Sequence, residues 1–168
     1  KSTLLLMCGA FILASCADDN DSNPVLQKPT KFVLNTPALA TNGTYDLANS
    51  STVEFTCTQP DYGFPISTKY TIEIATKADM SNATKMSTSF KTAKIDVDAA
   101  EMAAALTEQA LKDGKTEADF PIDIPVYIRA KATPITAMGS EIDSLNHSYA
   151  IESNVITLKH VHLAFSLP

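Results

Sequence analysis

Short runs in which apolar and polar residues alternate follow one another through most of the chain. In one of them every second residue is apolar, namely Val53, Phe55 and Cys57. Alternation of this kind places one set of side chains on each face of a β-strand. Strands are therefore predicted, in chain order, at residues 31–35, 52–57, 70–75, 122–130 and 155–158.

The longest predicted strand contains a proline. Its inward-facing set is Ile124, Val126, Ile128 and Ala130. Pro125 has no N–H group to donate to a neighbouring strand. We therefore expect this strand to begin near a sheet edge or to carry a bulge at Pro125.

A single helix interrupts the strands. Asp98 with Glu101 three residues later resembles a capping box, with Asp in place of Ser or Thr. Gly114 is typical of a helix end. Between them the apolar residues recur at helical spacing, so one face of the helix is predicted to pack against the sheets: Ala99, Met102, Leu106 and Ala110.

The order of these elements predicts the fold class. Turns or loops are indicated at Asn42-Gly43, Tyr62-Gly63 and Met138-Gly139. Several short strands separated by turns predict an all-β protein, an immunoglobulin-like or fibronectin type III-like β-sandwich with one inserted helix.

The amino-terminal segment follows a different pattern. Residues 4–14 form an apolar run of about half the length that a membrane-spanning helix needs. A run of this length is typical of the apolar core of a secretory signal peptide, with Lys1 as the remainder of its basic start. The alternative, a buried core helix, fits poorly with the polar stretch that follows the run.

A cysteine marks the border of the apolar run. The sequence Leu-Ala-Ser-Cys at 13–16 resembles a bacterial lipobox, in which the cysteine is acylated and the chain is cut before it. This resemblance predicts lipidation at Cys16. The residues Asp18, Asp19 and Asp21 resemble the acidic export tag of surface lipoproteins in the Bacteroidetes, although a soluble linker has the same composition.

Composition narrows the classes of partner. The 168 residues carry 13 Lys and Arg against 19 Asp and Glu, for a net charge of −6. The sequence contains no basic cluster of the kind that binds nucleic acid, so we expect no nucleic-acid partner. The cysteines Cys8, Cys16 and Cys57 are too few for a disulfide framework. We interpret Cys57 as a small buried hydrophobe, with a reactive thiol as the alternative.

No catalytic motif is evident in the sequence, and we expect neither an enzyme nor a bound cofactor or metal. His160 and His162 alternate, so that both side chains could reach one metal ion, but no third ligand is near in sequence. An exposed polar face of a strand explains the two histidines equally well. Asp119 and Asp123 flank Phe-Pro and leave open a weak cation site in a loop.

The candidate ligand-binding residues are aromatic. Tyr62 and Phe64 lie in the densest aromatic stretch, with Tyr70 just after, and the chain has no Trp. Sugar rings stack on aromatic side chains, so Tyr62 and Phe64 are a possible platform for a glycan. The alternative is that both residues pack over one end of the sandwich.

Several stretches together resemble one family. These are LASCADDNDSNPVL, PTKFVLNTPA, YDLANSSTVEFTCTQPDYGFP, KYTIEIATKADM, VYIRAKATP and ESNVITL. They are similar to the amino-terminal module of the SusE/SusF outer-membrane starch-binding lipoproteins of Bacteroidetes, and to SusE most of all.

The resemblance implies a domain organisation. We expect a lipoprotein signal peptide at 1–15, an acidic and polar tether at 16–29, an immunoglobulin-like SusE amino-terminal domain at 30–160, and the start of a linker at 161–168. In that family, glycan-binding modules with aromatic platforms follow. The sequence begins at Lys1 rather than Met, so we expect a fragment without its first residues. It ends at KHVHLAFSLP, where the family's next module would begin, so it is expected to lack those modules.

The expected function follows from this organisation. The chain would be the non-catalytic spacer domain of an outer-membrane lipoprotein on the cell surface. Its parent would bind starch or a related polysaccharide for uptake, with SusC/SusD-type transporter components as possible partners. The alternative is a lipid-anchored protein–protein interaction or adhesion module.

Overall fold

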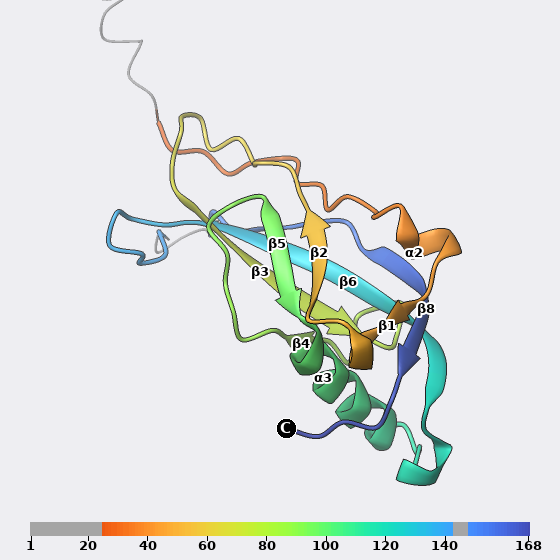
Figure 1. The fold of residues 1–168 in the computed structure, drawn as a ribbon. Coiled ribbons are helices and arrows are strands. Elements are labelled where there is room, and N and C mark those ends of the chain that lie inside the picture. The colour runs from red at the N-terminus through yellow and green to blue at the C-terminus, as the bar shows by residue number, and fades with distance from the viewer. Residues whose placement is uncertain (1–24, 143–147) are drawn as a thin grey trace, which may run out of the picture.

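The computed structural model describes residues 25–142 and 148–168, and this part of the chain is mostly β-sheet with few helices (Figure 1). The predicted signal peptide, the lipidation site Cys16 and most of the predicted tether lie outside the described residues. The described elements are, in chain order, α2 (Leu39–Asn42), β1 (Tyr45–Asp46), η1 (Leu47–Asn49), β2 (Thr52–Thr56), β3 (Thr68–Ala75), β4 (Thr84–Lys85), β5 (Lys94–Asp98), α3 (Ala99–Lys112), η2 (Glu117–Asp119), β6 (Ile122–Pro134), β7 (Ile151–Glu152) and β8 (Ile156–Leu163).

The strands form two sheets. The larger sheet has the order β1-β8-β6-β3-β4, with β7 pairing to β6, and the smaller sheet consists of β2 and β5. Strand β6 is antiparallel to both β3 and β8, whereas β1 is parallel to β8. Figure 1 shows the smaller sheet lying across the larger one. This arrangement is compatible with the all-β sandwich that the sequence predicts.

The core lies between the two sheets. The predicted alternation in β2 is confirmed, because Val53 and Phe55 are buried while their neighbours are exposed. One buried cluster joins these residues to Ile72, Val126 and Ile128 of the larger sheet. The burial of apolar side chains from both sheets, at about 25 cal/mol per Å², is what holds the sheets together.

Helix α3 closes one end of the sandwich, as its apolar stripe predicts. The carboxylate of Asp98 accepts a hydrogen bond from the backbone N–H of Glu101 at 3.3 Å, so Asp98 is the N-cap. The Glu101 side chain instead accepts from the backbone N–H of Ser87, at 2.6 Å. Helix α3 is thereby attached at its first turn to the segment between β4 and β5.

The last two long strands extend beyond their predicted ends. Strand β6 reaches Pro134, and its pairing with β8 shifts register between Ile124 and Val126, which confirms the bulge expected at Pro125. Strand β8 continues to Leu163, whose side chain is buried. Residues 161–163 therefore belong to the sheet, and the strand passes the domain end expected at residue 160.

The strand predicted at 31–35 forms only one isolated bridge, between Leu34 and Cys57. Phe32 and Leu34 are buried, as the alternation requires. However, the Asn154 side chain accepts from the N–H of Leu34 at 2.9 Å and donates to its carbonyl at 3.2 Å. A side-chain amide thus satisfies backbone groups that a neighbouring strand would otherwise satisfy.

Residues 25–35 form an arm along the end of β2 and the loop after it. Asn35 donates to the Thr56 carbonyl, and Gln27 donates to the Tyr62 carbonyl, both at 2.9 Å. The arm is therefore attached to the domain from its first residues onward.

No helix within the described ranges 25–142 and 148–168 is long and apolar enough to cross a membrane.

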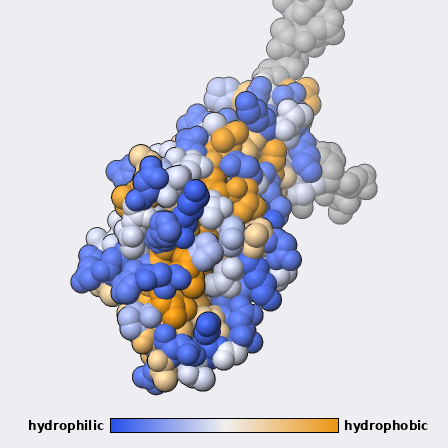
Figure 2. Space-filling view, turned by 90° about the vertical axis from the view of Figure 1, so that its right-hand side faces the viewer, coloured by the Kyte–Doolittle hydropathy of each residue, from blue (hydrophilic) through white to orange (hydrophobic). Residues whose placement is uncertain are grey.

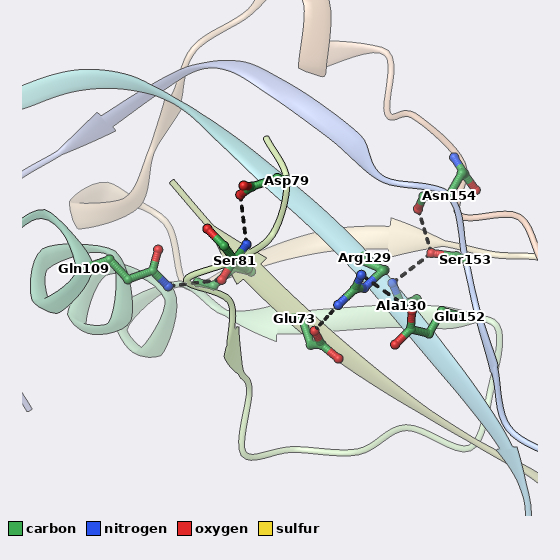
Figure 3. A network of polar contacts seen from close by, with 10 residues as sticks. Glu73, Asp79, Ser81, Gln109, Arg129, Ala130, Glu152, Ser153 and Asn154 are labelled. Carbon is green, nitrogen blue, oxygen red and sulfur yellow. Dashed lines mark hydrogen bonds and ion pairs between the residues drawn. The ribbon is translucent and has the colours of Figure 1, made fainter. Parts of the chain in front are cut away.

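A buried glutamine joins α3 to the larger sheet (Figure 3). Gln109 accepts from the N–H of Thr76 at 2.9 Å and donates to the Ile74 carbonyl at 3.1 Å and to the Thr84 hydroxyl at 2.8 Å. All three hydrogen bonds of the Gln109 side chain are buried or partly buried. Gln109 therefore fixes the position of the helix as well as packing it.

We predict that Gln109→Ala lowers the free energy of unfolding by about 2–3 kcal/mol, because it leaves buried backbone groups without partners. Denaturant unfolding measures the change. Glu108→Ala, on the exposed side of the same helix, is the matched control and should change stability by less than about 0.5 kcal/mol. Equal effects of the two substitutions would contradict a joining role for Gln109.

Candidate functional site

The predicted aromatic platform lies on the loop between β2 and β3, which we call the aromatic loop (residues 58–67). Gly63 adopts φ +94°, and its N–H donates to the Asp61 carboxylate at 2.8 Å. A Cβ at Gly63 would lie 2.5 Å from the carbonyl oxygen of Val25. Glycine is therefore required here both by the backbone conformation and by the arm that passes over the loop.

The loop gathers the three predicted aromatic residues around one cavity. Tyr62, Phe64 and Tyr70 line a cavity of about 190 Å³, together with Lys91 at its rim. The structure thus brings together the side chains that the sequence singled out. A cavity of this size holds a few water molecules or one small ring.

Tyr62 does not present an open stacking face. Its side chain is only 1% exposed, and its hydroxyl is buried without a hydrogen-bond partner among the described residues. Burial, with a smaller contribution from Tyr70, raises the pKa of Tyr62 well above its ordinary value. Phe64 is half-buried. Within the aromatic loop it is therefore Tyr62 that packs inward, and Phe64 is the more accessible of the two candidates.

Tyr70 and Cys57 lie beneath the loop. Burial raises the pKa of the Cys57 thiol to about 11, so at neutral pH the thiol is protonated. Cys57 is 8% exposed and forms no disulfide, and its thiol donates to the Ala93 carbonyl at 3.7 Å, which confirms the interpretation as a small buried residue. Burial also raises the pKa of Tyr70, and proximity to Cys57 adds to this effect. Neither group is poised for chemistry at neutral pH.

The candidate cation ligands are dispersed. Nδ1 of His162 lies 2.8 Å from a carboxylate oxygen of Asp123. Asp119 instead accepts from the N–H and hydroxyl of Thr116, and this capping box lowers its carboxyl pKa. Within residues 25–142 and 148–168, no group of three or more His, Cys, Asp or Glu side chains is placed to hold a metal ion.

The sequence did not single out the polar network on the larger sheet (Figure 3). Arg129 forms ion pairs with Glu73 at 2.7 Å and Glu152 at 3.5 Å. Ser153 accepts from the N–H of Ala130 at 2.8 Å and donates to the Asn154 carbonyl at 2.7 Å. These contacts join neighbouring strands and the arm, so the network is structural. Only Gln109 left a signal in the sequence, since it lies at helical spacing from Met102 and Leu106.

One face of the molecule carries an apolar band (Figure 2). Figure 2 shows hydrophobic side chains gathered along the middle of this face, between hydrophilic margins. Helix α2 and strand β8 lie on this side in Figure 1. Two large exposed apolar residues belong to this region of the chain, Leu39 in α2 at 51% exposure and Val155 before β8 at 40%.

We predict that Tyr62→Phe leaves the free energy of unfolding unchanged or raises it by about 1 kcal/mol, because it removes a buried hydroxyl without a partner. Tyr62→Ala should lower it by about 3–5 kcal/mol, because it leaves a cavity. Thermal and denaturant unfolding provide the comparison. A clear loss of stability in Tyr62→Phe would show that the hydroxyl has a bound partner.

Comparison with known proteins places the chain in a family. The model of the family described as SusE outer membrane protein matches residues 18–131. The match covers the arm, the aromatic loop, α3 and most of β6. No solved structure matches the chain. The SusE family match agrees with the resemblance carried by the sequence motifs, and the chain belongs to the SusE outer membrane protein family.

Proposed function

We propose that this chain is a lipid-anchored surface protein of a Sus-type glycan-uptake system, and that its described domain is a non-catalytic spacer. The observation that carries the proposal is the position of the two ends. In Figure 1 the arm enters at one end of the domain and the carboxyl terminus lies beside α3, toward the other end. A domain traversed from end to end separates whatever precedes it from whatever follows.

Both ends are fixed to the domain, as a spacer requires. At the entry, Gln27 donates to the Tyr62 carbonyl at 2.9 Å. At the exit, the ring of Phe165 packs edge-on against Phe120 at 5.4 Å, and the N–H of Ser166 donates to the Thr107 hydroxyl at 3.3 Å. A flexible entry or exit would let attached segments swing freely, whereas these contacts fix their directions.

The anchor of the proposal is Cys16. The lipobox-like sequence at 13–16 follows an apolar run, and eight residues separate Cys16 from Val25, the first described residue. Membership of the SusE outer membrane protein family supports an outer-membrane location. Several acyl chains on one cysteine would hold the protein firmly, since each buried methylene contributes about 0.8 kcal/mol.

Glycan binding is assigned to other modules of the parent protein, with starch or a related polysaccharide as the ligand. The described domain offers little to a glycan, because Tyr62 is buried and the chain has no Trp. We also assign the domain the immunoglobulin-like or fibronectin type III-like topology. SusC/SusD-type transporter components are its proposed neighbours in the membrane.

A second function, a lipid-anchored protein–protein interaction module, is favoured by the apolar band in Figure 2. Contiguous apolar surface rimmed by polar residues is typical of protein contact sites. If the apolar band binds a transporter component, the domain can act as a spacer and as an interaction module at the same time.

We predict that Cys16→Ser moves the protein from the membrane fraction to the soluble fraction of a Bacteroidetes host, because the acylated thiol is lost. Cell fractionation and intact-mass measurement test this. Cys8→Ser, within the apolar run, is the matched control and should leave both the location and the added lipid mass unchanged. Lipid mass retained in Cys16→Ser would refute the anchor.

We also predict that residues 17–168 migrate without retardation in native gels containing amylopectin. Phe64→Ala is run beside the unmodified chain, because Phe64 is the accessible aromatic residue of the cavity. Retardation that Phe64→Ala abolishes would place a glycan site in this domain and overturn the spacer assignment.

A further inference from the structure

Charges are divided unequally along the long axis of the domain. The end at which the arm enters carries Lys28, Lys31, Lys91 and Lys131, none of which forms an ion pair with the described residues. We call these four residues the basic end. Two further lysines there, Lys69 and Lys94, are paired with Glu141 and Glu54.

The opposite end is acidic. Helix α3 and the segment after it carry Glu101, Glu108, Asp113, Glu117 and Asp119. Lys112 is paired with Glu108 at 3.0 Å, and Lys77 is paired with Asp113 at 3.5 Å. The protein has a net charge of −6. Seven described lysines form no ion pair with the described residues, and four of them lie at the basic end, the others being Lys85, Lys115 and Lys159. The basic end is therefore a local excess of positive charge on an acidic protein.

The basic end is open to solvent and includes apolar tips. Lys28 and Lys131 line one open hollow of about 390 Å³ beside β7, where Glu152 is already paired with Arg129. Val25 is 75% exposed. Met138, at the tip of the turn after β6, is 95% exposed. Exposed lysines and exposed apolar side chains on the same surface are typical of protein surfaces that bind a charged lipid interface.

We propose that the basic end docks onto an anionic lipid surface, so that the domain stands upright with α3 directed away from the membrane. The proposal rests on the anchoring at Cys16 proposed above. The eight residues between Cys16 and Val25 reach at most about 30 Å when extended, which keeps this end close to the bilayer. The attraction acts over about 8 Å at physiological salt, so the distant acidic end does not cancel it.

The acids Asp18, Asp19 and Asp21 are a competing partner, because they precede the arm in the chain. The lipid surface is favoured because a bilayer presents many anionic groups to all four lysines at once. It also accepts Met138 and Val25, which an acidic segment does not. The test must therefore separate docking on lipid from capture of the lysines by these acids.

Residues 16–168 are coupled through Cys16 to vesicles that contain a maleimide lipid, which makes the test independent of acylation in the cell. Cys57 stays unreacted, because it is buried and burial raises its pKa to about 11. The chain has no Trp, so Met138→Trp supplies a single reporter at the basic end. Leu167→Trp supplies the matched reporter at the opposite end. Brominated lipids then quench whichever reporter approaches the bilayer.

We expect the Met138→Trp reporter to be quenched at least about twofold more on phosphatidylglycerol vesicles than on phosphatidylcholine vesicles, with the difference lost at high salt. The Leu167→Trp reporter should show no such difference. Substituting the basic end with Gln at residues 28, 31, 91 and 131 should abolish the difference. The matched control, Gln at Lys85, Lys112, Lys115 and Lys159, should preserve it.

Three results would overturn the proposal. The first is equal quenching on the two kinds of vesicle, and the second is a difference that survives in the basic-end variant. The third is a difference that emerges only after Asp18, Asp19 and Asp21 are replaced by Asn, which would assign the lysines to the acidic segment. Failure of anchoring in cells would instead be seen with Cys16→Ser, so the two proposals fail separately.

Discussion

The rest of the structure depends on the pairing of strand β6 along both of its edges. Its thirteen residues pair with β3 on one side and with β8 and β7 on the other. Because side chains alternate along a strand, this pairing fixes two faces at once. Val126 and Ile128 enter the shared core, while Arg129 faces outward and meets Glu73 and Glu152. The register of β6 with its neighbours thus determines both which side chains enter the core and which form the outer polar network.

The same frame explains why the ends of the chain are fixed. The arm lies against the end of β2, and Asn154, just before β8, holds Leu34 through both backbone groups. At the other end Phe165, just after β8, packs on Phe120, just before β6. Entry and exit are therefore attached to residues at the ends of the central strands, and the entry is attached to the aromatic loop as well. A domain built in this way holds the entry and the exit of the chain at fixed positions relative to each other.

Local pattern was sufficient for the elements whose side chains face a core on one side only. Alternation predicted β2 and β6, and the stripe from Ala99 to Ala110 predicted α3. The strand at 31–35 was not predicted correctly, because Asn154 is distant in sequence and takes the place of a pairing strand. The aromatic residues were brought together as expected, but the burial of Tyr62 depends on the arm passing over Gly63, which no local pattern reveals.

At the end where the arm enters, the aromatic residue Tyr62 is buried and serves the fold, whereas the lysines are exposed and can meet a partner. The backbone carbonyl of Tyr62 holds the arm, and its ring is buried in the domain, so the ring stabilises the fold and offers no open face to a ligand. Lys69 and Lys94 at this end are ion-paired, whereas the four lysines of the basic end form no ion pair with the described residues and remain available. Since an unpaired lysine in water costs the fold almost nothing, stability alone does not require the lysines to gather at one end. The four lysines beside the entry of the chain are therefore better explained by what lies next to that entry, which under the proposed anchoring at Cys16 is the membrane.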